Sequence, residues 1–235
     1  MKLLGMIGGT SWHSTMAYYR LINQGVGEAI GTQANPELLI HSINIEVMRR
    51  QDKQEINEKY LQVSRGLENA GAGALLICAN TPHMACEYVQ PRIGIPILHI
   101  ADATGREASR LGLKKLGLLG NRPTMTGTFI PGPLRERYGI ETLIPESYSI
   151  PKAHYFVSKE LTQGQFTDAA KAFFLKQIRM LRERGADGII LGCTELPLLI
   201  QAEDSGLPLL STTDLHAQMA VDFILGDQKQ KPERS

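Results

Sequence analysis

The sequence is short of the features that mark several classes of protein. It has three cysteines among 235 residues, Cys78, Cys86 and Cys193, and none of them forms a CxxC motif. An odd number without that spacing indicates neither a disulfide framework nor a zinc site. Charge of one sign is also lacking, because 25 Lys and Arg residues face 24 Asp and Glu residues, and no basic cluster is interleaved with aromatic residues. We therefore expect no metal and no nucleic-acid partner.

Long hydrophobic runs are absent as well. The longest, 74–79 and 188–193, are about a third of the ~20 residues that a membrane-spanning helix needs. The apolar run at 3–7 is shorter than the apolar region of a secretory signal, and no small-residue cleavage site follows it. With 43% hydrophobic and 21% charged residues, the composition is that of an ordinary globular chain. We expect a cytoplasmic protein that does not bind membranes.

What the sequence does contain is an alternation of short apolar runs and longer amphipathic stretches. This rhythm is typical of βα units whose strands are buried on both faces, and it predicts an α/β fold with mostly parallel sheets. Strands are expected at 3–7, 38–43, 74–78, 95–100, 116–119, 188–191 and 207–210. Helices are expected at 14–30, 55–70, 101–110, 167–184 and 214–225.

The chain also contains an internal repeat. Segment 2–8 (KLLGMIG) matches 114–120 (KKLGLLG), so that Gly5 and Gly117 are equivalent at a spacing of 112 residues, and 95–98 matches 207–210 at the same spacing. A third match, 67–77 with 181–191, has a spacing of 114. Three matches in the same order predict two similar lobes, the first formed by 1–99 plus 213–235 and the second by 100–212. We expect them to face each other across a cleft.

Ligands of parallel α/β sheets bind beyond the carboxyl ends of the strands. The segments at those ends here, 8–12, 79–83, 121–124 and 193–195, are rich in glycine, hydroxyl and amide groups. No GxGxxG spacing and no Walker lysine is present. A small anion held by backbone N–H groups fits such loops better than a nucleotide does.

At the spacing of 114, Cys193 is equivalent to Ala79. A thiol at a strand end that leads into a helix can have its pKa lowered and can act as a thiolate. A buried structural cysteine is the alternative.

Four motifs together resemble a known family. They are GGTSWHST at 8–15, NTPH at 80–83, HIADATG at 99–105 and GCTE at 192–195. In this order, over nearly the whole chain, they are similar to the aspartate/glutamate racemases, which work without a cofactor. The resemblance implies two Rossmann-like lobes related by a pseudo-twofold, an active-site cleft between them, a homodimer, and an acidic amino acid or similar small dicarboxylate as substrate. Neither pyridoxal phosphate nor a metal is expected.

In that family one thiol from each lobe exchanges a proton with opposite faces of the substrate α-carbon, which is general acid/base catalysis. The resemblance assigns Cys193 to the second lobe's thiol. The equivalent position of the first lobe, directly before Asn-Thr, is Ala79, which cannot transfer a proton. Cys78 is its neighbour, but successive strand residues point to opposite faces, so we expect the Cys78 thiol to face the core.

Three readings are compatible with this departure. In the first, His83, Thr81 or a water bound by them supplies the proton of the first lobe, and the protein is a racemase. In the second, Cys193 alone protonates one face of an enolate, as in the related one-thiol decarboxylases and isomerases. In the third, the protein binds a dicarboxylate without turning it over.

The resemblance also points to substrate-binding residues. Ser11, Asn80, Thr81, Thr124 and Thr194 match positions that hold the α-carboxylate and amino group, with helix capping as the alternative. Arg49 lies where the family often has a basic residue for the side-chain carboxylate. Glu195, in the GCTE motif, and His216, similar to a histidine near the second strand end, complete the predicted contacts; core packing is the alternative for His216.

Overall fold

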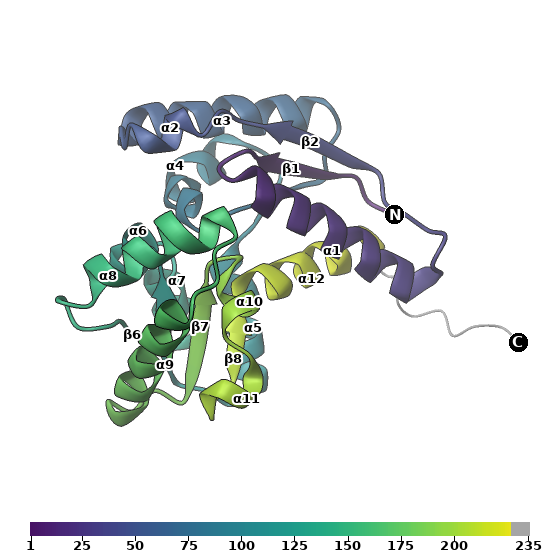
Figure 1. The fold of residues 1–235 in the computed structure, drawn as a ribbon. Helices are drawn as coiled ribbons and strands as arrows, with labels where there is room; N and C mark the ends of the chain where they lie inside the picture. Colours follow the sequence, from purple (N-terminus) through teal and green to yellow (C-terminus); the bar gives the residue numbers. More distant parts are fainter. Residues whose placement is uncertain (227–235) are drawn as a thin grey trace, which may run out of the picture. The chain divides into compact units, whose positions relative to one another are not determined.

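The computed structural model describes residues 1–226, which form two compact units. Within the described residues, the first consists of 1–99 and 216–226, and the second of 100–215. Each unit contains one four-stranded parallel sheet with helices packed against it (Figure 1). The predicted α/β class with two similar lobes is therefore confirmed. Residues 227–235, which we expect to belong to the first lobe, lie outside the described part of the chain.

The sheet of the first unit has the strand order β2-β1-β3-β4. Its strands run parallel, with Gly8 opposite Ser42 and Ile7 opposite Ile77. The elements of this unit are β1 (Leu4–Gly8), α1 (Trp12–Ile30), β2 (Leu38–Ser42), α2 (Glu46–Arg49), α3 (Lys53–Asn69), β3 (Ala74–Ile77), the 3-10 turn η1 (Thr81–Ala85), α4 (Cys86–Val89), η2 (Gln90–Arg92), β4 (Ile97–Leu98) and most of α12 (Thr212–Leu225).

Helices cover both faces of this sheet. Because successive strand residues point to opposite sides, each strand contributes apolar side chains to both layers. Leu4 and Met6 pack with Tyr18 of α1 and Val221 of α12 on one face. Ile7 and its neighbours in β3 pack with α3 and α4 on the other face. Helices α1 and α12 lie side by side (Figure 1): a Cβ added at Gly25 would come within 2.8 Å of Val221.

The sheet of the second unit has the order β6-β5-β7-β8, which repeats the order of the first. Its central strands are in register with Gly120 opposite Gly192. The elements of this unit are α5 (Ile100–Arg110), β5 (Lys115–Gly120), α6 (Arg122–Thr126), α7 (Pro131–Tyr138), β6 (Glu141–Leu143), α8 (Ile150–Tyr155), the π-turn η3 (Phe156–Glu160), η4 (Leu161–Gln163), α9 (Asp168–Glu183), β7 (Gly188–Gly192), α10 (Leu196–Leu199), α11 (Ala202–Ser205) and β8 (Leu209–Ser211).

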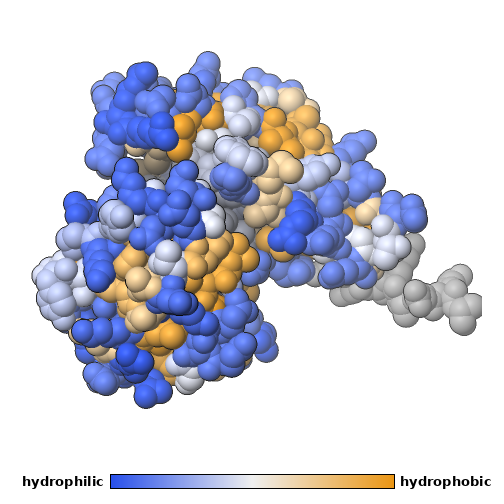
Figure 2. Space-filling view, in the orientation of Figure 1, coloured by the Kyte–Doolittle hydropathy of each residue, from blue (hydrophilic) through white to orange (hydrophobic). Residues whose placement is uncertain are grey.

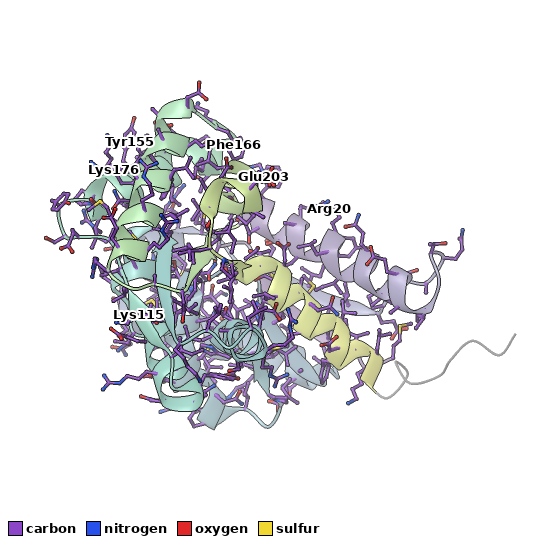
Figure 3. All side chains as sticks on the ribbon, turned by 90° about the horizontal axis from the view of Figure 1, so that it is seen from below. Arg20, Lys115, Tyr155, Phe166, Lys176 and Glu203 are labelled. Atoms are coloured by element: carbon purple, nitrogen blue, oxygen red, sulfur yellow. The ribbon has the colours of Figure 1, made fainter. Side chains whose placement is uncertain are left out.

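The core of the second unit is formed by apolar residues of β5 and β7 with those of α8 and α9. Leu119 and Leu191 pack against Phe156 and Phe174. Charged side chains such as Lys176 and Glu203 lie at the surface of this unit (Figure 3). The surface in view is mostly hydrophilic with separate apolar areas (Figure 2).

All seven predicted strands are present, but two details differ from expectation. The strand expected at 95–100 is reduced to the two residues of β4, because α5 already begins at Ile100. Strand β6 was not predicted: with the sequence Glu-Thr-Leu it has no apolar run, and its register comes from pairing with β5. Within residues 1–226 no helix is both long and apolar enough to cross a membrane.

Candidate active site

The thiol of Cys193 follows β7 at the carboxyl edge of the second sheet. Its Sγ donates a hydrogen bond to Oε2 of Glu195 at 2.7 Å. Cys193 is half-buried and Glu195 is buried. Burial, the negative charge of Glu195 and the hydrogen bond to it raise the pKa of Cys193 well above its ordinary value. In this arrangement the resting group is a thiol with a proton acceptor beside it.

The loop after β5 borders the same edge. Asn121 caps α6, its side chain accepting from the backbone N–H of Thr124. Thr124 is fully buried and packs against the backbone of β7: a Cβ added at Gly192 would lie 2.9 Å from its Cγ2. Glycine at this position therefore lets α6 approach the strand end that carries Cys193. The threonine next to the thiol, Thr194, is half-buried.

The equivalent edge of the first unit carries Ala79. Ile77 is paired with Ile7 of β1 as Leu191 is paired with Leu119 of β5, so Ala79 and Cys193 each stand two residues beyond matching strand positions. The chain bends after β3, where the N–H of Ala79 donates to Ile77 O at 2.9 Å. Cys78, within the bend, is buried in the core, and burial raises its pKa. Its thiol lies in the core of the first unit with Leu76 and Tyr18.

Three of the predicted residues lie within four positions after Ala79. The side chain of Asn80 is buried, and its Oδ1 has no hydrogen-bond partner among the described residues. Thr81 begins η1 and is half-buried. His83 is 1% exposed; its Nδ1 lies 2.9 Å from Ala79 O and 3.1 Å from Asn80 O.

These contacts define the state of His83. Carbonyl oxygens only accept, so Nδ1 carries the proton. Burial, followed by the nearby His99, lowers the pKa of His83 well below its usual value. The ring is therefore neutral, and it fixes the loop at 79–80 by donating to both carbonyls.

His83 belongs to a buried histidine cluster, formed by His83, His99 and His216. The ring of His83 lies 4.8 Å from that of His99 and 5.3 Å from that of His216. Both nitrogens of His216 are occupied: Nε2 lies 2.6 Å from Leu98 O and Nδ1 lies 3.0 Å from the hydroxyl of Tyr18. Nε2 thus donates to the carbonyl, and Nδ1 accepts from Tyr18. In this arrangement neither nitrogen of His216 is left for a substrate.

Two more predicted contacts have partners within the first unit. Ser11 is the N-cap of α1, accepting from the N–H of Ser14 at 3.3 Å. Arg49 is exposed and forms an ion pair with Glu46 at 2.7 Å. Capping and ion pairing thus account for these side chains in this structure. In the described part of the chain, no group of three or more His, Cys, Asp or Glu side chains is arranged to hold a metal ion.

The sequence pattern does not predict that His99 joins the histidine cluster or that Tyr18 contacts the cluster through His216. It places Tyr18 only in an amphipathic helix and His99 only in a family motif. A weak signal for both residues is a polar side chain at a position that the helical or strand pattern places in the core. Tyr18, on the buried face of α1, is an example.

Comparison with known proteins gives one consistent result. Residues 7–220 match the family described as Asp/Glu/Hydantoin racemase. A putative Asp/Glu racemase from Yersinia pestis superimposes with a TM-score of 0.90 at 36% identity, over 96% of this chain and 100% of that one. An aspartate racemase homologue from Pyrococcus horikoshii OT3 gives 0.84 at 30% identity, over 95% and 99%. The broad specificity amino-acid racemase RacX of Bacillus subtilis is 22% identical over 96% of this chain and its own full length.

Proposed function

The chain belongs to the Asp/Glu/Hydantoin racemase family, and we therefore propose that it is an amino-acid racemase that acts on aspartate or glutamate without a cofactor. Cys193 is the acid/base group on one face of the substrate. Its substrate is a small anionic amino acid. The family resemblance favours a homodimer, and the sequence favours a cytoplasmic location.

The observation that carries this proposal is the pair formed by Cys193 and Glu195. A cysteine whose thiol donates to a buried carboxylate at 2.7 Å can lose its proton without solvent. The carboxylate holds the proton that the sulfur releases and can return it. This is the arrangement that a thiol needs in order to remove a proton from carbon in one turnover and donate one in the reverse turnover.

The proton steps follow from the resting state. When Cys193 serves as the base, Glu195 first accepts the thiol proton, and the thiolate then takes the α-proton; the C–H electron pair stays on the substrate as a carbanion delocalised into its carboxylate. When Cys193 serves as the acid, the resting thiol donates its proton directly to that carbanion. Because the pKa of Cys193 is raised, the acid direction requires no prior step.

The proton on the opposite face comes from the first unit, where Ala79 offers none. His83, Thr81 or a water that they bind is our candidate. A neutral His83 with its proton on Nδ1 has a buried lone pair on Nε2 that can accept a proton, but burial and the nearby His99 lower its pKa and make it a weak base. The buried, unpartnered Oδ1 of Asn80 is suited to accept from a substrate ammonium group. Ser11, Thr124 and Thr194 are the further candidates for holding the α-carboxylate and amino group.

Isotope exchange tests the proposal directly. Each enantiomer of aspartate and of glutamate is incubated with the protein in deuterium oxide, and α-proton loss is followed by proton NMR together with chiral analysis. Racemisation predicts α-proton loss with inversion in the wild type and in a Cys78→Ala control, and neither in Cys193→Ala. Absence of exchange from all four amino acids would refute the racemase proposal.

The alanine at position 79 favours a second candidate, a one-thiol decarboxylase or isomerase, because that chemistry needs a proton donor on one face only. This candidate predicts no α-proton exchange from the four amino acids. With a substituted malonate in deuterium oxide, its decarboxylase form predicts loss of CO2 and incorporation of one deuteron on a single face, both abolished by Cys193→Ala.

A further inference from the structure

The chain segment that leads from β3 into η1 is held by two buried side chains, and the proton steps described above leave these contacts unused. The hydroxyl of Ser14, in the first turn of α1, donates to Cys78 O at 2.6 Å. Nδ1 of His83 lies 2.9 Å from Ala79 O and 3.1 Å from Asn80 O. Ser14 is 2% exposed and His83 is 1% exposed, so water does not compete for these carbonyl groups. Three successive carbonyl groups thus accept from side chains, and we call residues 78–80 the anchored segment.

The turn between β1 and α1 brings Ser14 to the anchored segment. Gly9 has a φ of +91°, and a Cβ added there would overlap the carbonyl oxygen of Ile43, so the turn requires glycine. The N–H of Gly9 donates to Oγ1 of Thr15 at 3.0 Å and closes the turn onto the first turn of α1. Ser14 therefore reaches a carbonyl group 64 residues later in the chain. This contact also explains a serine on the buried face of α1, because a buried hydroxyl without a partner is destabilising.

The ring of His83 is enclosed within the first unit. It packs edge-on against His99 at 4.8 Å and against His216 at 5.3 Å between ring centroids. Nδ1 is engaged by the two carbonyl groups, and Nε2 is buried as well. A substrate that arrives from solvent does not meet a buried nitrogen. The ring is therefore linked to the strand end through the carbonyl groups that it holds.

Anchoring the carbonyl groups also fixes the direction of the peptide N–H groups. In a planar trans peptide the N–H of the next residue points opposite to the carbonyl group, and no peptide bond among the described residues is cis. The carbonyl groups of Ala79 and Asn80 point at His83, so the N–H groups of Asn80 and Thr81 point away from it. Ser14 and His83 together thus set both the place and the orientation of this part of the chain. Such placement matters for catalysis, because a displacement of about 1 Å can cost roughly 100-fold in rate.

We infer that Ser14 and His83 are positioning residues, which hold residues 79–81 in the place from which a proton reaches the first-unit face of the substrate carbanion. The inference rests on the proposed function for that reaction. It removes the His83 ring from the proton transfer and leaves Thr81, or a water held at residues 79–81, as the group that carries the proton. Cys193 belongs to the second unit, so loss of either anchoring contact should affect one face of the substrate more than the other.

The ratio of inversion to retention in deuterium oxide reports on the first-unit face. The reaction is started from the enantiomer whose α-proton Cys193 removes. The carbanion then takes a deuteron either from Cys193, after its thiol has exchanged with solvent, which gives retention, or on the opposite face, which gives inversion. Ser14→Ala should lower the ratio of inversion to retention about 10- to 100-fold, as expected for a misplaced proton donor.

Tyr18→Phe is the matched control, because it removes another buried hydrogen bond of α1 and leaves the anchored segment untouched. It should leave the ratio unchanged, even where total exchange decreases with stability. Ser14→Thr keeps the hydroxyl and should give a higher ratio than Ser14→Ala. Equal decreases in Ser14→Ala and Tyr18→Phe, or no recovery in Ser14→Thr, would overturn the role given to the Ser14 hydroxyl.

Two substitutions of His83 distinguish positioning from proton transfer. The amide nitrogen of an asparagine can donate from the place of Nδ1 to the same carbonyl groups, but the amide does not titrate as an imidazole does. We therefore expect His83→Asn to retain more inversion than His83→Ala and to keep the pH dependence of the wild type. Equal loss of inversion in the two variants would show that the ring itself transfers the proton, and would refute the positioning role.

Amide hydrogen exchange separates this inference from the proposed function, because it needs no turnover. The N–H of Ala79 donates to Ile77 O within the bend that the anchored segment forms. In Ser14→Ala its exchange should become at least about tenfold faster relative to that of Leu75 in β3, because the segment opens locally, whereas in Tyr18→Phe it should not. Faster exchange of this kind in a protein without turnover would support the anchoring and refute the racemase. Turnover in the wild type, with amide exchange and the ratio both unchanged in Ser14→Ala, would refute this inference alone.

Discussion

Replacing Glu195 by Gln tests the proposed acid/base pair with the smallest change in shape. The amide oxygen can still accept from the Cys193 thiol, but the amide cannot take its proton. A hydrogen bond to a charged group stabilises by about 1.5–3 kcal/mol. At 1.36 kcal/mol for each factor of ten, loss of the charge at the 2.7 Å contact corresponds to a decrease of about 10- to 150-fold in α-proton exchange.

The same substitution should make the thiol more reactive toward an alkylating reagent. Removing the negative charge beside Cys193 lowers the pKa of its thiol toward the ordinary value, because the carboxylate is one cause of the increase. At fixed pH, alkylation of Cys193 by iodoacetamide should be faster in Glu195→Gln than in the wild type, while proton exchange is slower. Glu203→Gln, an exposed glutamate of the same unit, should alter neither rate. Exchange within about twofold of wild type, or both rates falling together, would refute the role given to Glu195.

Three further predictions concern the elements that hold the site. Gly192→Ala should lower the free energy of unfolding by about 1–3 kcal/mol, because the added Cβ would lie 2.8 Å from a backbone oxygen. Gly132→Ala has open space around the added Cβ and should leave the free energy of unfolding unchanged. Urea unfolding of the two variants tests this difference. Tyr18→Phe should lower the free energy of unfolding by about 1–3 kcal/mol in the same assay, because it removes the buried hydrogen bond from the Tyr18 hydroxyl to Nδ1 of His216. An unchanged urea midpoint would contradict the contribution of this bond. Burial lowers the pKa of His83 in the folded protein. Below pH ~6.5 the unfolded chain therefore binds more protons than the folded one, and the free energy of unfolding should decrease as the pH is lowered. His83→Gln should show a shallower fall between about pH 7.5 and 5; an identical slope would mean that His83 titrates normally.

The two units share one sheet order but place different groups at equivalent strand ends. Sheet order is the same in both, and the strand ends that carry Ala79 and Cys193 correspond. In the second unit a half-buried thiol has a carboxylate next to it. In the first, a buried neutral histidine holds the backbone of the loop at 79–80. The proposed proton transfer is thus asymmetric, with a sulfur acid on one face only.

The sequence alone determined the α/β class, the duplication and the segments at the strand ends. These depend on local patterns: apolar runs of strand length, helical spacing, and repeated segments such as 2–8 and 114–120. The GCTE motif also led to the prediction of Cys193 and Glu195 as site residues, and only the structure shows the hydrogen bond between them. Strand β6 escaped prediction because pairing with β5, and not its own composition, makes it a strand.

Contacts between distant parts of the chain were decided by tertiary structure. Tyr18 and His216 are 198 residues apart, and they meet because α1 and α12 cover the same face of one sheet. Arg122 and His154 are 32 residues apart, and they meet because α6 and α8 pack together beside β5. A sequence pattern reports which face of an element is apolar, whereas the partner of a buried polar group is set by which elements the sheet order brings together. That is why the strand-end motifs could be read from the sequence and the histidine cluster could not.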